Sequence, residues 1–279
     1  GYSHVNKIMT ENGQAKGVEV LGGEKYQANK LVASAIDLQQ TFLELVGEEH
    51  LEADFLTKIR HFILDEFSIF GVHLALNEAP AHTAATFNPE IDQAFKLDIG
   101  LETSQDYQLL WSEIRAGKLP EHLGLFCSIP TLFDSNQAPK GKHTALIWQP
   151  VPYDLKEGGP ERWDNIKNDY MDRCIAKWRE YAPNLNDKNI IMKTALSPLD
   201  IERKLYNMKK GGVFMGRTML GQLEYFRPLP ELSQYRTPIE NLYLCGACCH
   251  PGGGIIGAAA LIAAEIIAED HGLDKWWES

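Results

Sequence analysis

The hydrophobic pattern of this chain is strongest near its C-terminal end. The apolar run at residues 242–245 predicts a short buried strand. His-Pro-Gly-Gly-Gly at 250–254 interrupts the run, and the stretch 255–268 is then small and apolar on nearly every side. We expect a buried helix of about three to four turns there. The pattern therefore predicts a strand, a glycine-rich turn and a helix N-terminus, in that order.

Alternation of apolar and polar residues predicts β-structure at the start of the chain. Residues 5–20 should form a hairpin that turns at 11–13, Glu-Asn-Gly, and residues 25–35 a further strand. A helix should follow at 38–47, with Asp37 as its N-cap and a glycine at its end.

Strand and helix patterns are interspersed in the middle of the chain. We expect strands at 67–76, 125–131, 144–149 and 190–195, and helices at 51–62, 105–116 and 163–181. Ser197 and Pro198 have the residue types of an N-cap and a first helical position. His73 lies inside the first of these strands, where a packed core histidine is favoured over a catalytic one.

Composition narrows the classes of protein that fit. The chain has 279 residues, 44% hydrophobic and 23% charged, enough for one large or two ordinary globular domains. A formal net charge of −11 argues against a nucleic-acid partner. Five cysteines, an odd number, favour a reducing, cytoplasmic setting. Peripheral contact with a membrane stays open. The run 255–268 is too short to cross a bilayer, and Glu265 interrupts it.

The strand, turn and helix pattern suits an anionic or electron-rich ligand, because a helix N-terminus presents free N–H groups and a positive dipole end. A Rossmann fingerprint is formally present, since Gly252, Gly254 and Gly257 fit G-x-G-x-x-G. That motif needs a second strand with an acidic residue about twenty positions on, and none is expected before Ser279. A plain glycine-rich turn without a ligand is the other alternative.

The stretch 222–258, QLEYFRPLPELSQYRTPIENLYLCGACCHPGGGIIGA, closely resembles the C-terminal signature of the phytoene-desaturase-like FAD oxidoreductases. These are carotenoid desaturases, carotenoid isomerases and relatives in the flavin amine-oxidase superfamily. The pieces RP, YRTP, LYLCGA and HPGGG occur in the family's order and spacing. A weaker resemblance runs from about Val5 to the end, and 134–143 resembles a substrate-domain loop of the family.

The resemblance implies an α/β fold with an α+β substrate region. The chain would be the C-terminal half of a two-domain FAD-binding oxidoreductase that lacks the N-terminal Rossmann βαβ unit. Residues 1–47 would be the returning part of the FAD-binding domain, 48–205 a substrate domain with a mixed sheet and helices, and 206–279 the C-terminal part of the FAD-binding domain. A polypeptide carrying the dinucleotide-binding half, as a separate subunit or a cleaved fragment, would be its partner.

The resemblance also implies the cofactor positions. FAD would lie close to the backbone where side chains are small, and the first N–H groups of the helix would face the flavin ring. The implied cofactor-binding residues are Gly246, Ala247, Gly253, Gly254, Ile255 and Ile256.

Catalytic residues are harder to assign, because a flavin carries the chemistry itself. His250, Arg227 and Arg236 are candidates, but no catalytic base can be named. For both arginines a structural role, hydrogen bonding to backbone carbonyls, is favoured. The cluster Cys245-x-x-Cys248-Cys249-His250 could suggest a metal, but it lacks a second ligand pair. Packing is favoured for these cysteines, and a thiol beside a flavin stays open.

Three functions remain. The first is an FAD-dependent desaturase or dehydrogenase that removes a hydride and a proton from an apolar, isoprenoid-like or cyclic substrate, together with the missing half. The second is a flavin-dependent isomerase without net redox. The third is a non-catalytic interaction subunit.

Overall fold

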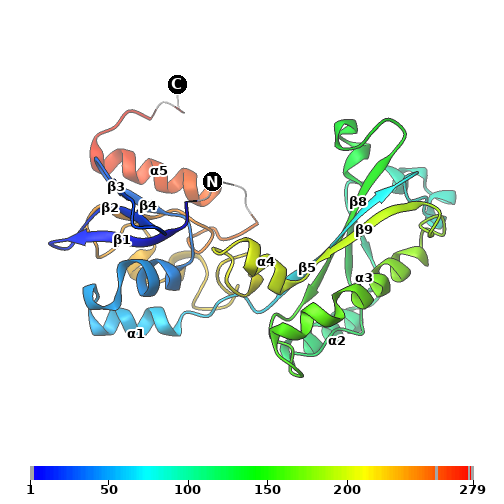
Figure 1. Ribbon diagram of the computed structural model, residues 1–279, viewed down its shortest axis with the longest axis horizontal. Coiled ribbons are helices and arrows are strands. Elements are labelled where there is room, and N and C mark those ends of the chain that lie inside the picture. Colours follow the sequence, from blue (N-terminus) through cyan, green and yellow to red (C-terminus); the bar gives the residue numbers. More distant parts are fainter. Residues whose placement is uncertain (1–2, 255–256, 276, 278–279) are drawn as a thin grey trace. The chain divides into compact units, whose positions relative to one another are not determined.

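The computed structural model describes residues 3–254, 257–275 and 277 of the chain. The chain divides into two compact units, and Figure 1 labels many of their helices and strands. Unit 1 contains Gly1–Asp65, Asn207–Lys209 and Val213–Ser279, and unit 2 contains Glu66–Tyr206 and Lys210–Gly212.

Unit 1 begins with the expected hairpin. Strands β1 (Val5–Glu11) and β2 (Gln14–Val20) pair antiparallel, and Asn12 and Gly13 between them both have positive φ, as a tight hairpin turn requires. Strand β3 (Lys25–Gln27) adds to β2 and completes a three-stranded sheet.

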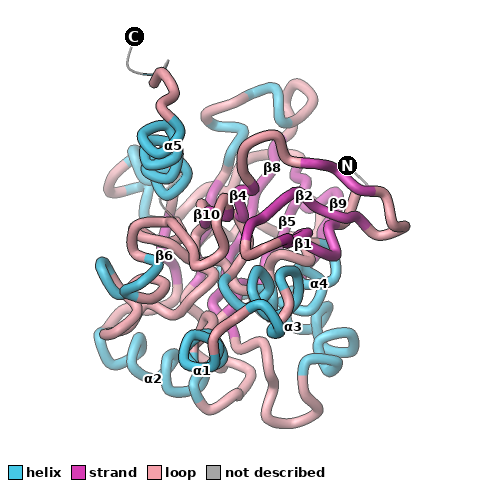
Figure 2. The backbone as a smooth tube through the Cα atoms, turned by 90° about the vertical axis from the view of Figure 1, so that its left-hand side faces the viewer, coloured by secondary structure: helices cyan, strands magenta, loops and turns pink. Residues whose placement is uncertain are grey.

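A second, two-stranded sheet joins distant parts of unit 1. Strand β4 (Val32–Ser34) pairs in parallel with β10 (Leu242–Leu244), and Figure 2 shows the two side by side. The expected association of the 25–35 region with the strand at 242–245 is confirmed. The expectation of one continuous strand over 25–35 is wrong, because the chain bends at Asn29 and Lys30 and passes from one sheet to the other.

Helices cover the sheets of unit 1. A π-helix at Gln40–Val46 follows Asp37, whose carboxylate accepts the Gln40 N–H at 3.0 Å, so the predicted cap is confirmed. Helix α1 spans Ala53–His61, and α5 spans Ala258–His271.

The segment 48–65 belongs to unit 1, although the sequence was expected to enter the substrate domain after Gly47. The reason is packing. Phe55, Ile59 and Phe62 are buried in the same cluster as Leu38 and Leu244. The α1 pattern was predicted correctly, but amphipathicity does not say against which core a helix packs.

Unit 2 is built on one five-stranded sheet. Its spatial order is β6 (Leu97–Ile99), β7 (Leu125–Ser128), β8 (His143–Val151), β5 (Ser68–Leu76) and β9 (Ile190–Leu196). Every pairing in this sheet is antiparallel, so the expectation of a mixed sheet is wrong. The expected strands are present, and β10 belongs to a different sheet from β8, as predicted.

Helices α2 (Ser104–Arg115) and α3 (Trp163–Arg179) lie on one side of this sheet (Figure 1). Helix α4 (Pro198–Lys204) begins with a capping box between Ser197 and Asp200, which confirms the predicted start. Trp163 and Tyr170 of α3 pack against Phe70 of the sheet, with ring centroids 5.6 and 5.0 Å away.

The opposite side of the sheet, here called the open face, carries exposed apolar side chains. Trp148 is 46% exposed and Met192 is 63% exposed. His73 is exposed on this side as well, so the expectation of a core histidine is wrong. Strand alternation places His73 on one side of the sheet, but only the positions of the helices decide which side is covered.

The remaining regular segments are short helical turns. They are Glu48–His50, Thr83–Thr86, Pro89–Gln93, Pro130–Leu132, Ser135–Gln137, Pro160–Arg162, Lys209–Gly211, Glu224–Phe226 and Pro230–Leu232. Among the described residues, no helix combines the length and the apolar character that a bilayer crossing needs.

Candidate functional site

Strand β10 leads directly into the candidate site. Beyond its last residue, Cys245 donates its N–H to Ser34 O at 2.8 Å and so stays beside β4. A Cβ at Gly246 would lie 2.3 Å from the carbonyl oxygen of Ala35. Only glycine fits at this position, and the requirement comes from packing against the end of β4.

A cavity of about 310 Å³ opens where β10, the glycine turn (residues 245–254) and the start of α5 meet. All of its lining residues belong to unit 1. Its walls consist mostly of glycine and alanine, and they include Gly246, Ala247, Gly253, Gly254 and Ala260. Four of the six expected cofactor-binding positions therefore line one cavity, while Ile255 and Ile256 lie outside the described residues.

The helix after the turn begins later than expected. Gly257 has a φ of 76° and precedes the first helical residue, Ala258, so the expected start at Ile255 is wrong. The Gly257 carbonyl accepts the Leu261 N–H at 2.9 Å, and the N–H groups of residues 258–260 have no acceptor within the helix among the residues that the structure describes. Ala259 and Ala260, two of these residues, line the cavity.

Phe214 supports the glycine turn from behind. A Cβ on Gly253 would come within 2.6 Å of Phe214 Cα, and one on Gly254 within 3.3 Å of Phe214 Cε1. The neighbouring Val213 lines the cavity itself. The segment 213–216 is thus a wall of the site, which sequence analysis did not identify because nothing local marks it.

Arg227 lies beneath this wall and is only 2% exposed. Its Nη2 donates to Phe214 O and Ala247 O, both at 2.8 Å, and its Nη1 donates to Gly216 O and Gln222 O, both at 3.3 Å. These are the contacts expected if Arg227 has a structural role, because all of them are to backbone carbonyls. Burial lowers the pKa of Arg227, but a guanidinium stays charged at neutral pH.

Asp65 holds the same segment from its N–H side. Its carboxylate accepts the backbone N–H groups of Phe214, Met215 and Gly216, at 2.7, 3.2 and 3.0 Å. A carboxylate thus binds the N–H groups of these peptides, and a guanidinium binds carbonyls of the same segment. We call this arrangement the Asp65–Arg227 clamp.

None of the three candidate catalytic residues is among the lining residues of the cavity. Arg236 forms a bidentate ion pair with Asp270 of α5, at 2.7 and 2.6 Å, and Tyr243 Oη donates to the same carboxylate at 2.9 Å. His250 has an exposed side chain, and its backbone carbonyl accepts from Tyr235 Oη at 2.6 Å. Arg227 comes nearest to the cavity, because it binds the backbone carbonyl of Ala247, which is a lining residue.

The cysteines fit a packing role. Cys248 and Cys249 are buried, with their sulfurs 3.9 Å apart. The hydrogen bond with Cys248, together with burial, raises the pKa of Cys249 well above its usual value. Cys245 lines the cavity, and burial raises its pKa too. Within the described ranges, no group of His, Cys, Asp and Glu residues is arranged to hold a metal ion.

Helix α5 is apolar on most sides but poorly covered by the rest of unit 1. Of its described side chains only Ala259, Ala263 and Ala268 are buried, whereas Leu261 is 50% exposed. A helix that is hydrophobic all round normally lies inside a core. Near its start, α5 therefore exposes apolar side chains at Ala260 and Leu261 that the described part of unit 1 does not cover.

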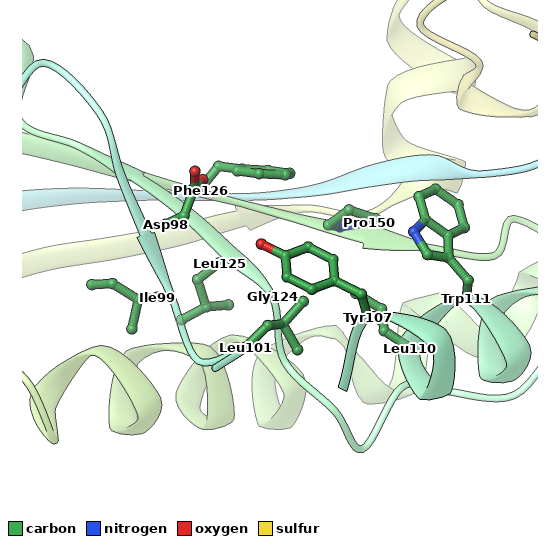
Figure 3. A pocket seen from close by; sticks show the side chains of 10 residues that line it. All are labelled: Asp98, Ile99, Leu101, Tyr107, Leu110, Trp111, Gly124, Leu125, Phe126 and Pro150. Atoms are coloured by element: carbon green, nitrogen blue, oxygen red, sulfur yellow. The ribbon is translucent and has the colours of Figure 1, made fainter. Parts of the chain in front are cut away.

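Unit 2 holds a smaller cavity of about 60 Å³. Tyr107 and Trp111 reach into it from α2, and Phe126 and Pro150 from the sheet (Figure 3). Pockets that hold cofactors usually measure roughly 300–1,000 Å³, so the cavity of unit 1 is the stronger candidate.

Comparison with known proteins gives a consistent set of relatives. The chain is 32% identical to a limonene dehydrogenase subunit of Castellaniella defragrans, over 98% of this chain and 51% of that protein. It is 29% identical to a lycopene-forming phytoene desaturase of a Paracoccus species, over 95% of this chain and 49% of that one. The chain thus spans about half the length of these relatives. No family model matches it.

Among solved structures, the chain is similar to a putrescine oxidase variant with redesigned cofactor binding. The TM-score is 0.56 at 12% identity, and the likeness covers 97% of this chain and 48% of the other. At this identity the likeness shows a shared fold and nothing more.

Proposed function

We propose that this chain is part of a phytoene-desaturase-like FAD-dependent oxidoreductase, which its similarity to these relatives along nearly its whole length supports, and that its cavity in unit 1 holds the flavin end of FAD. The enzyme to which it contributes would be a desaturase or dehydrogenase of an apolar substrate. FAD supplies the oxidising chemistry by accepting a hydride from a substrate carbon.

The cavity is the observation that carries this proposal. Its volume of about 310 Å³ is at the lower end of ligand pockets, so it suits part of a dinucleotide rather than all of FAD. Glycine and alanine walls leave the backbone accessible to a flat ring, as the residues implied by the family resemblance require. Free N–H groups at the start of α5 would stabilise negative charge on the reduced ring.

A second polypeptide segment would complete the site. The limonene dehydrogenase relative is named as a subunit, which supports a multi-subunit enzyme. The uncovered side of α5 and the short parallel pair β4–β10 offer the surface that a dinucleotide-binding βαβ unit would cover. That segment would bind the adenosine and pyrophosphate, while this chain binds the flavin end.

The open face of unit 2 supports an apolar substrate. Trp148 and Met192 expose large apolar surfaces there, and Phe126 and Leu146 are only half-buried. In register these side chains lie on neighbouring strands, since Trp148 faces Phe126 and Leu146 faces Ser128. Several large apolar side chains on one exposed face suit a hydrocarbon substrate better than a charged one.

Binding of riboflavin to the purified full chain tests the proposal. Ala260 is exposed, lies in a helix and lines the cavity, so Ala260→Leu fills the space without straining the backbone. We expect about tenfold weaker binding or more, as overfilling a site costs roughly 1–3 kcal/mol. Gly254→Val should abolish flavin retention too, but Gly254 has a φ of 84°, so any side chain there also strains the turn.

Ala264→Leu is the matched control, because Ala264 lies one turn further along α5 and does not line the cavity. Its riboflavin affinity should stay within about twofold of the parent. Equal affinities of the parent and the Ala260 variant would refute the site.

A further inference from the structure

Within the Asp65–Arg227 clamp, Arg227 is a buried cation next to the cavity, and no direct ion pair to it is found among the described residues. Arg227 is almost fully buried, and in the described chain its donors meet only neutral backbone carbonyls. Its Nε has no hydrogen-bond partner among the residues that the structure describes. A buried cation without an ion pair is rare and costly, so its position calls for a functional reason.

The Arg227 guanidinium lies directly behind residues that line the cavity. Nη2 binds the carbonyl oxygen of Ala247, and a Cβ on Gly252 would lie 3.3 Å from Nε. Both Ala247 and Gly252 line the cavity. Water is excluded between the guanidinium and this wall, so its field is screened less than that of a surface charge.

Asp65 is a carboxylate whose charge favours the charged form of Arg227, and the two side chains bind the same peptides. Its carboxylate binds N–H groups of 214–216, while Arg227 binds the carbonyls of Phe214 and Gly216. The electrostatic influence of Asp65 on Arg227 is favourable but indirect. The segment 213–216 therefore lies between the Asp65 carboxylate and the cavity, whereas the Arg227 guanidinium contacts the lining of the cavity.

We propose that Arg227 is a positioning residue that makes the cavity selective for an anionic ligand, and that it favours the reduced, anionic flavin over the oxidised, neutral one. The inference rests on the proposed flavin site. Asp65 moderates the effect, because it offsets part of the Arg227 charge from the far side of the wall.

The test is the ratio of the dissociation constants of oxidised and reduced riboflavin for the full chain, measured anaerobically at mildly alkaline pH. Arg227→Gln removes the charge and should lower the preference for reduced riboflavin by about tenfold. Arg227→Lys keeps the charge but loses the planar fork, so both forms should bind less tightly and the ratio should change little.

Asp65→Asn distinguishes charge from mere structure. It removes the counter-charge, so the preference for reduced riboflavin should increase, opposite in sign to the Arg227→Gln effect. A purely structural clamp predicts that the Arg227 and Asp65 variants weaken both forms equally. Arg236→Gln, the same substitution at a pair that does not line the cavity, should leave the ratio unchanged.

The outcomes separate this inference from the function on which it rests. Failure of the parent chain to bind either form of riboflavin would refute the flavin site and the inference with it. Binding by the parent with an unchanged ratio in Arg227→Gln would refute the inference alone. If Arg227→Gln does not fold, an unchanged or lowered preference for reduced riboflavin in Asp65→Asn refutes it.

Discussion

Helices α3 and α5 differ in how far their apolar side chains are buried within their own units. Helix α3 is amphipathic and buries six side chains, Trp163, Tyr170, Met171, Cys174, Ile175 and Trp178. Helix α5 is more apolar, yet it buries only three alanines among its described residues. The apolar side chains of α3 are buried by the rest of unit 2. Many apolar side chains of α5 are not buried by the described part of unit 1.

The difference separates stability from assembly. Substitutions under α3 should destabilise unit 2 directly, because its core is complete. Substitutions on the uncovered side of α5 should leave the folding of this chain nearly unchanged and weaken association with a second polypeptide. Four variants, taken in order of decreasing effect, test this distinction.

The largest effect is expected from Trp178→Ala. Trp178 is fully buried in the core of unit 2, and its Nε1 donates to His82 Nε2 at 3.0 Å. Truncation should destabilise unit 2 by about 3–5 kcal/mol, as large-to-small changes in a packed core do. Urea denaturation followed by circular dichroism measures this, with the half-exposed Trp148→Ala as the control. A similar loss in both variants would show that the core does not lie under α3.

Leu261→Glu should act on association. Leu261 is 50% exposed on α5, so the free energy of unfolding of this chain should change by less than about 0.5 kcal/mol. In the complex, loss of a buried leucine contact should weaken binding by about 10- to 100-fold. Isothermal titration with the dinucleotide-binding partner measures this. Leu220→Glu, at a loop residue that is 92% exposed, is the control. Equal affinity for the Leu261 variant and its parent would show that the partner does not cover α5.

Acid should weaken unit 2 through Asp200. Burial alone would raise the pKa of Asp200, but hydrogen bonds from Ser197 and Lys167 outweigh it and the pKa is lowered. A carboxyl group whose pKa is lowered in the folded state stabilises the fold at any pH above its pKa in the unfolded state. This stabilisation is lost as the pH falls through the pKa of the folded state. Asp200→Asn should cost about 1 kcal/mol at neutral pH and flatten the loss of stability below about pH 4. An acid profile identical to that of the parent would exclude this role for Asp200.

Arg236→Gln should have the smallest effect. The ion pair with Asp270 is bidentate, but the Arg236 side chain is 46% exposed, and such pairs contribute less than about 1 kcal/mol. Thermal unfolding in low and high salt measures it, and the difference from the parent should shrink as salt rises. Loss of flavin binding in this variant would instead assign Arg236 to the site.

Local signals account for what the sequence predicted correctly. The turn at Asn12 and Gly13 and the capping box of Ser197 and Asp200 each depend on residues within three positions of one another. The glycine turn and the strand before it were recognisable for the same reason, whereas the cofactor-binding positions were implied by the family resemblance.

Contacts between distant residues account for what was missed. Asp65 binds backbone N–H groups of the segment 214–216, and Arg227 binds carbonyls of the same segment. No residue near either one in the sequence indicates these contacts. The exposed position of His73 depends on which side of the sheet α2 and α3 cover. The start of α5 at Ala258 depends on the backbone of Gly257, which composition alone does not set.

We propose above that this chain forms half of a flavin site and that a second polypeptide segment completes it. Size-exclusion chromatography with mass detection and flavin absorbance, applied to the native preparation, tests it most directly. We predict a complex larger than the 31.4 kDa of this chain, held by an interface above about 2,000 Å², that retains stoichiometric FAD through purification only when a dinucleotide-binding polypeptide is present. A monodisperse 31.4 kDa monomer that holds stoichiometric FAD would contradict it.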